Sequence, residues 1–92
     1  MDLEALIEKH NDEFLNFARV ENKRSKRADL HAFMLLDELF PDDGDMVAAA
    51  EYDIIYLAPD PEELAKRATE AQVIELIRCG MVIADDSLAM YA

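Results

Sequence analysis

Apolar residues recur along this chain with two periods, one typical of helices and one typical of strands. From position 3 to position 21 they fall three and four residues apart, with polar residues on the opposite side, and Asp2 precedes the run as a candidate N-cap. The pattern predicts an amphipathic first helix of about five turns that ends near residues 22–27. His10 lies on its apolar stripe, where we expect a partly buried, hydrogen-bonded side chain rather than a ligand or a base.

Residues 28–40 form a second run that is apolar around most of its circumference. Ser25 or Asp29 can begin a helix there, and Pro41 ends it because proline cannot continue the backbone hydrogen bonds. A helix with so little polar surface is expected in the centre of the core or in a subunit interface.

The middle of the chain predicts a short helix followed by a strand. Asp45 can cap a helix over residues 46–50. Residues 52–57 are rich in β-branched and aromatic side chains, which favours a strand. Alternation divides those side chains between two faces, with Ile55 and Leu57 on one and Tyr52, Ile54 and Tyr56 on the other. Both faces are apolar, so the strand is either covered on both sides or meets a partner through one of them.

Two more helices are signalled by their caps. Asp60 is a favourable N-cap and Pro61 a favourable first helical residue, so a short helix is predicted up to residue 68. Thr69 and Gln72 have the spacing of a capping box for a second helix, and Gly80 stands where a left-handed residue would end it.

A β-hairpin is predicted to run to the end of the chain. Apolar residues 81–84 and 88–91 flank a turn made by Asp85, Asp86 and Ser87. Together with residues 52–57, the hairpin gives one short three-stranded sheet, antiparallel or mixed, and a sheet of that size needs helices packed on a face. The fold class is therefore α+β, with residues 1–92 forming a single domain.

Charge is distributed unevenly along the chain. Twenty-one acidic residues and nine basic ones give a formal net charge of −12. Between Arg27 and Lys66 there are eleven acidic residues and no basic one. Such a field repels nucleic acid and membranes from most of the surface and attracts basic partners.

Cysteine content and hydropathy predict a soluble intracellular protein that does not enter a membrane. Cys79 is the only cysteine, which excludes an internal disulfide and fits a reducing compartment. No apolar run approaches the roughly 18 residues that span a bilayer. The first four residues lack the basic and then apolar pattern of a secretory signal.

The sequence offers little to catalysis, and we expect no enzyme, no cofactor and no metal. A nucleophile needs a base within reach, and Ser25, Ser87, Thr69 and Cys79 are each explained by a turn, a cap or a helix end that raises a thiol pKa. His31 and His10 have no second ligand at a zinc-binding spacing. The acidic residues around Gly44 do not follow the spacing of an EF-hand loop.

Two charged clusters are the candidate binding residues. The first is an acidic face that would meet a basic partner, and it comprises Asp37, Glu38, Asp42, Asp43, Glu51, Asp53, Glu62 and Glu63. The alternative is a basic patch that could contact nucleic-acid phosphates, made of Lys23, Arg24, Lys26 and Arg27. No aromatic residues are interleaved with the basic ones for base stacking, so a solvated turn between helices is the preferred interpretation and nucleic acid is an unlikely partner.

Three segments resemble small uncharacterised proteins of tailed bacteriophages and prophages: residues 50–57 (AEYDIIYL), 74–80 (IELIRCG) and 86–91 (DSLAMY). The resemblance implies a phage-encoded accessory product made inside a bacterial cell, and it brings no catalytic or binding residues with it. By charge alone, the chain is also similar to phage proteins that mimic nucleic acid, including several anti-CRISPR inhibitors.

Three hypotheses follow for the function. The first is an interaction protein that presents its acidic face to a nucleic-acid-binding surface of a host defence or transcription protein. The second is a self-associating structural or assembly protein, expected as a homodimer, that uses the apolar surplus of residues 30–40 or 52–57. The third is a nucleic-acid binder that works through Lys23, Arg24, Lys26 and Arg27.

Overall fold

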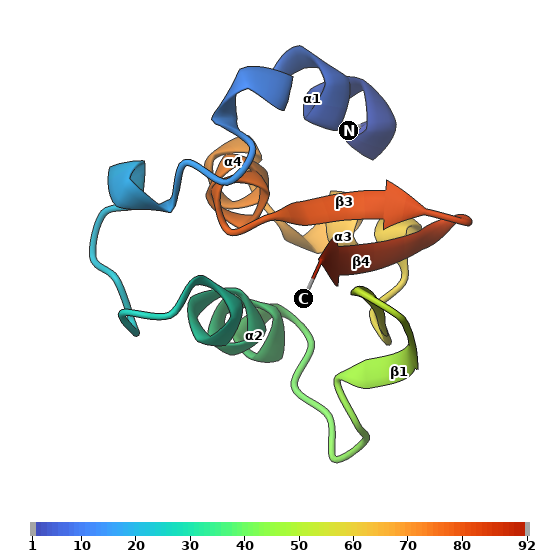
Figure 1. Ribbon diagram of the computed structural model, residues 1–92. Helices are drawn as coiled ribbons and strands as arrows, with labels where there is room; N and C mark the ends of the chain where they lie inside the picture. Colours follow the sequence, from blue (N-terminus) through green and yellow to red (C-terminus); the bar gives the residue numbers. More distant parts are fainter. Residues whose placement is uncertain (1, 92) are drawn as a thin grey trace.

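The computed structural model describes residues 2–91 (Figure 1). These residues contain four α-helices, four strands and two short 3-10 turns, both of which lie between the first and second helices. In chain order the elements are α1 (Leu3–Lys9), the 3-10 turns η1 (Asn11–Glu13) and η2 (Phe17–Arg19), α2 (Ala28–Leu39), β1 (Val47–Glu51), β2 (Ile54–Leu57), α3 (Pro61–Arg67), α4 (Glu70–Arg78), β3 (Met81–Ala84) and β4 (Ser87–Tyr91). The predicted α+β class is confirmed.

The first helix is much shorter than the apolar spacing predicted. Asp2 caps α1 as expected, by accepting from the backbone N–H of Ala5, but the helix ends after Lys9. The chain then turns twice, and Leu15 adopts a left-handed conformation with a φ of 62°. The N–H of Leu15 donates to the carbonyl of Ile77, so this segment wraps around α4 instead of continuing as a helix. Contacts with α4 therefore override the local periodicity.

Helix α2 lies in the core, as its apolar circumference predicted. Its fully buried residues are His31, Ala32, Leu35 and Leu36. The helix begins at Ala28, as predicted, but the predicted cap was wrong, because Arg27 occupies the N-cap position and makes no side-chain capping bond. Ser25 accepts instead from the N–H of Arg27, which shapes the turn that leads into the helix.

The sheet has four antiparallel strands in the order β1-β2-β4-β3, so the prediction of three was wrong. The additional strand, β1, replaces the helix predicted for residues 46–50. An isolated helix of five residues is unstable despite its alanines, whereas pairing with β2 supplies backbone hydrogen bonds. Tyr52 belongs to the turn between them, with a φ of 51°, and not to the strand where it was predicted.

The C-terminal hairpin is confirmed. Asp85 and Asp86 both have positive φ angles, 50° and 61°, as a two-residue type I′ turn requires. Ser87 already belongs to β4, so the turn is one residue shorter than predicted. Ala92, the last residue of the predicted hairpin, lies outside the described residues.

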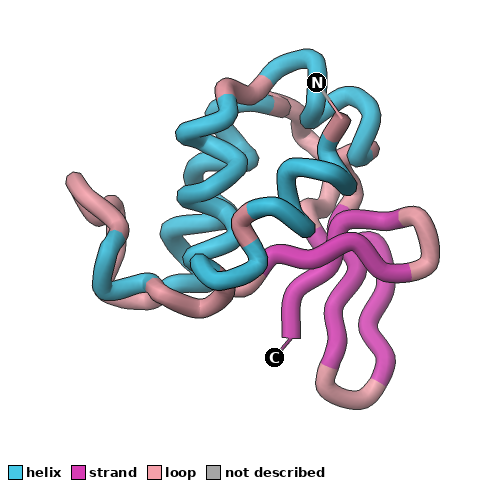
Figure 2. The backbone as a smooth tube through the Cα atoms, turned by 90° about the horizontal axis from the view of Figure 1, so that it is seen from above, coloured by secondary structure: helices cyan, strands magenta, loops and turns pink. Residues whose placement is uncertain are grey.

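One face of the sheet packs on the helices. Figure 2 shows the helices gathered on one side and the strands on the other. Ile55 and Leu57 share the face that joins the core, as alternation predicted, and Ile54 and Tyr56 are half-buried on the opposite face. The hydroxyl of Tyr56 donates to the carboxylate of Asp85, and this bond raises the pKa of the tyrosine above its ordinary value.

The predicted caps of α3 and α4 are present. Asp60 accepts from the N–H of Glu62, and Pro61 opens α3. Thr69 and Gln72 form the reciprocal capping box of α4. Gly80 follows α4 with a φ of 103°, the left-handed conformation predicted for it.

Candidate acidic interaction face

A hollow of about 310 Å³ lies where the end of α2, the following loop and α3 meet the start of β1. Its lining contains five carboxylates and one basic residue, Arg67. These acidic residues are Asp37, Asp42, Asp45, Asp60 and Glu63. Five negative charges and one positive charge leave a formal −4 in this small space, which we call the acidic hollow. Its size is at the lower end of the range of ligand pockets in proteins.

Arg67 shows how the acidic hollow holds a cationic side chain. Its guanidinium lies 4.6 Å from the centre of the Phe40 ring, and Nη1 donates to the carbonyl oxygen of Leu39 at 3.1 Å. Nε is 3.8 Å from a carboxylate oxygen of Glu63. An aromatic face, a free carbonyl at a helix end and a carboxylate together suit a guanidinium well.

The structure brings together only part of the predicted acidic face. Asp37, Asp42 and Glu63 line the acidic hollow, and Asp43 is exposed beside it. The others lie apart from it: Glu38 forms an ion pair with Arg24, Glu62 lines a separate hollow next to α1, and Glu51 and Asp53 flank Tyr52 at the β1–β2 turn.

Four charged or aromatic residues of the acidic hollow were not among the predicted binding residues. Asp45 and Asp60 had been assigned as helix caps; Asp60 is one, but no helix follows Asp45. Phe40 and Arg67 are 27 positions apart and come together because α3 packs beside the end of α2. No spacing in the sequence signals that contact.

Two members of the basic patch are engaged within the protein. The ammonium of Lys23 donates to the carbonyls of Val20 and Ala18 and lies 5.2 Å from the centre of the Phe17 ring. Arg24 pairs with Glu38 of α2. Lys26 and Arg27 are exposed. These contacts agree with the interpretation of the patch as a turn between helices.

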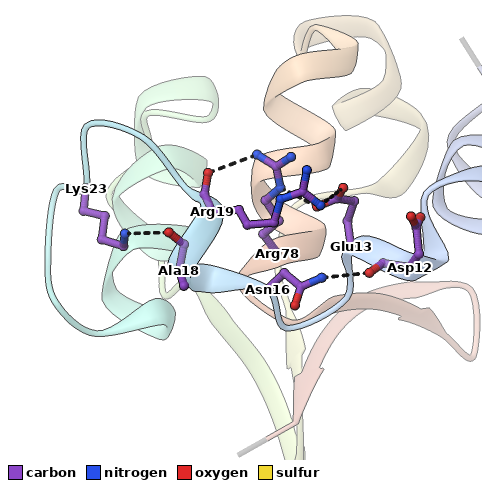
Figure 3. Close-up of polar contacts among 7 residues, drawn as sticks. All are labelled: Asp12, Glu13, Asn16, Ala18, Arg19, Lys23 and Arg78. Atoms are coloured by element: carbon purple, nitrogen blue, oxygen red, sulfur yellow. Dashed lines mark hydrogen bonds and ion pairs between the residues drawn. The ribbon is translucent and has the colours of Figure 1, made fainter.

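A buried carboxylate that the sequence did not reveal links the N-terminal segment to α4 (Figure 3). Glu13, only 8% exposed, accepts from Arg78 at 2.7 Å and from Arg19 at 2.6 Å. Arg78 also donates to the carbonyl of Arg19 at 3.3 Å. The hydrogen bond from Arg78 lowers the pKa of Glu13 below its ordinary value. Each carboxylate oxygen of Glu13 accepts a hydrogen bond from one of the arginines, so the cluster acts as a structural clamp.

His31 connects three elements in the same region. Its Nδ1 accepts a 3.0 Å hydrogen bond from the backbone N–H of Arg24, which places the proton of the neutral ring on Nε2. Nε2 is 3.1 Å from a carboxylate oxygen of Glu75, although the N–H points away from the direction of a linear hydrogen bond. The ring also packs edge-on against Phe17. These contacts give His31 a structural role.

Cys79 is buried at the end of α4 and is 3% exposed. Burial raises the pKa of its thiol to about 12, with a smaller contribution from the nearby carboxylate of Glu75. The predicted direction is confirmed, and burial rather than the helix end is the larger cause.

Comparisons with known proteins give no information about the function. No family model, curated protein or solved structure matches the chain. Among residues 2–91, no helix is long and apolar enough to span a membrane. Over the same residues, no group of three or more histidine, cysteine or acidic side chains is arranged to hold a metal ion.

Proposed function

We propose that this protein is a non-enzymatic interaction protein whose acidic face binds a basic surface of a partner protein. The convergence of five carboxylates on one hollow, with Arg67 held inside it, carries the proposal. The loop after α2 adds the exposed Asp43 beside the acidic hollow. A partner that brings arginine or lysine side chains to this face would meet an attractive potential, because Arg67 offsets only one of the five negative charges.

The partner that fits this surface best is a protein whose own ligand is nucleic acid. Nucleic-acid-binding grooves are lined with arginine and lysine spaced to meet phosphates, and an array of carboxylates on a rigid fold can occupy the same groups. The net charge of −12 favours such an encounter at long range. With the resemblance to small phage proteins, this supports an inhibitor of a host defence or transcription protein that acts in the bacterial cytoplasm.

Competition with DNA tests the proposal. The tagged protein would be used to capture partners from bacterial lysate at low salt, and each purified partner would then be mixed with labelled duplex DNA. We expect the protein to displace the DNA and to lose affinity steeply as salt rises. A partner that binds the protein and the DNA at the same time, with no salt dependence, would contradict the proposal.

Self-association is a second candidate function, favoured by one observation on α2. Leu30 and Met34 lie one turn apart on this helix and are 41% and 44% exposed. Two copies could bury this pair against each other as a homodimer. A double variant, Leu30→Lys with Met34→Lys, should then convert a dimer into a monomer when mass is measured by light scattering at ~100 μM, a concentration that detects weak dimers. A wild-type protein that is already monomeric there would exclude this candidate.

A further inference from the structure

The two edges of the sheet differ sharply in how they are covered. All five residues of β1 are exposed, whereas none of the four residues of β3 is. Figure 1 shows α1 beside β3 at one edge and β1 at the opposite side of the fold. Ile7 of α1 and Ile83 of β3 line one shared surface depression, so a helix lies beside β3. Among residues 2–91, β1 pairs only with β2.

An open edge of this kind usually carries more protection than β1 has. Exposed edge strands tend to hold proline, lysine or inward-pointing charges, because unpaired N–H and C=O groups recruit further strands. The sequence of β1 is Val-Ala-Ala-Ala-Glu, with Glu51 at its very end. Three consecutive alanines present small side chains on both faces, so a second backbone can approach without steric conflict. A bulge between Val47 and Ala49 is the one such protection in β1, and the pairing from Ala49 to Glu51 is regular.

Acidic residues stand at both ends of this edge. Asp45, which lines the acidic hollow, precedes β1. Glu51 is the last residue of β1, and Asp53 lies in the turn that follows. A strand added to β1 would therefore meet negative charge near each of its own ends, about five residues or 17 Å apart. Charge complementarity selects an extended segment with basic side chains at that separation.

We propose that β1 is a docking edge for an extended basic segment of a partner protein, which adds to the sheet as a fifth strand. The hypothesis rests on the proposed function and specifies how the partner is held: backbone hydrogen bonds along β1, and basic side chains at the acidic hollow and at the β1–β2 turn. A second copy of β1 fits the edge poorly, because pairing two such strands would bring their acidic ends together in chains that each carry a charge of −12.

The register identifies a reporter for strand addition. Glu51 and Ile54 flank the two-residue turn, so they form the hydrogen-bonded pair that closes it. The next pair, Ala50 and Ile55, is then of the non-hydrogen-bonded type, and the N–H and C=O of Ala50 point to the open edge. Addition of a strand would bond the Ala50 amide and leave the Glu51 amide as it is.

The test uses a short synthetic peptide in which lysine alternates with valine, and amide hydrogen exchange measured by NMR. At a peptide concentration ten times the Kd, we expect exchange at Ala50 to slow about tenfold. The matched control peptide has the same sequence and charge but is N-methylated at alternate backbone positions, which removes the donors along one edge. We expect it to bind at least about tenfold more weakly, the cost of losing backbone hydrogen bonds.

Each other outcome overturns strand addition. Equal binding of both peptides, salt-sensitive and without protection of Ala50, would leave acidic attraction intact but exclude docking on β1. If exchange of the Ala50 amide in the peptide-free protein became slower as the protein concentration rose, a second copy would be shown to fill the edge. No binding of either peptide would exclude a basic strand as the occupant. The DNA competition experiment would then still test the proposed function, independently of strand addition. A further variant, Ala50→Pro, should abolish peptide binding while the circular dichroism of the fold is retained.

Discussion

Arg78 Nε donates a 2.7 Å hydrogen bond to Glu13 Oε2 across 65 positions of the sequence. The carboxylate also accepts from Arg19, so one buried acid holds the N-terminal segment against the last turn of α4. An ion pair that is largely withdrawn from water and hydrogen-bonded on both oxygens is costly to break, because either partner left alone would be a poorly solvated charge.

Glu13→Gln should lower the Tm at pH 7, and the difference from wild type should shrink in acid. The pKa of Glu13 in the folded protein lies below its ordinary value of 4.5, which applies in the unfolded chain. The carboxylate therefore stabilises the fold fully above pH 4.5, and this contribution is lost as pH falls through the lower folded value. Thermal melts of both proteins over this range measure it. A Tm difference that stays constant down to pH 3 would show that the clamp does not depend on the charge of Glu13.

Gly80→Val should destabilise the fold by at least about 1 kcal/mol, because the φ of 103° is strained for a β-branched residue. A Cβ at this position would also lie 2.8 Å from the side chain of Leu15, which would have to move. Urea unfolding measures the change. Gly44→Ala is the matched control, since Gly44 has no positive φ and a Cβ there meets the side chain of Asp42 at 3.4 Å. Equal stabilities for the two variants would contradict the role assigned to Gly80.

Cys79 should be inert in the native protein. With its pKa raised to about 12 by burial, only about one thiol in ten thousand is ionised at pH 8. We expect reaction with a disulfide reagent such as DTNB to proceed at the rate of unfolding and to become fast in denaturant. A stoichiometric burst with the folded protein would show that the thiol is accessible.

The sequence predicted those parts of the fold that local signals determine. The capping box of Thr69, the aspartate and proline at the start of α3, Gly80 and the hairpin turn each depend on residues within a few positions of one another, and all are present. The face of β2 that carries Ile55 and Leu57 also followed from simple alternation.

The failures share a different cause. Residues 10–20 have helical spacing, yet their contacts with α4 bend them into 3-10 turns, and those contacts involve residues some 60 positions away. The sequence of β1 predicts a helix because alanine favours helices. Pairing with β2 stabilises this segment as a strand instead. The acidic hollow was predicted in part, since charge counting finds Asp37, Asp42 and Glu63 but not the stacking of Arg67 on Phe40.

Charge reversal at the acidic hollow tests the central claim most directly. The variant Asp37→Lys, Asp42→Lys, Asp43→Lys changes three exposed residues at and after the end of α2, where positive charge suits the helix dipole. The matched control, Glu8→Lys, Asp12→Lys, Glu21→Lys, makes the same change in net charge at exposed residues of the N-terminal segment.

The measurement is the affinity of each variant for a captured basic partner at low and high salt, after circular dichroism has shown that both are folded. We predict that the variant beside the acidic hollow binds at least about tenfold more weakly than the control variant at low salt, with a smaller gap at high salt. An equal loss of affinity in the two variants would show that only total charge matters. Native affinity in both would show that the acidic face does not bind the partner at all.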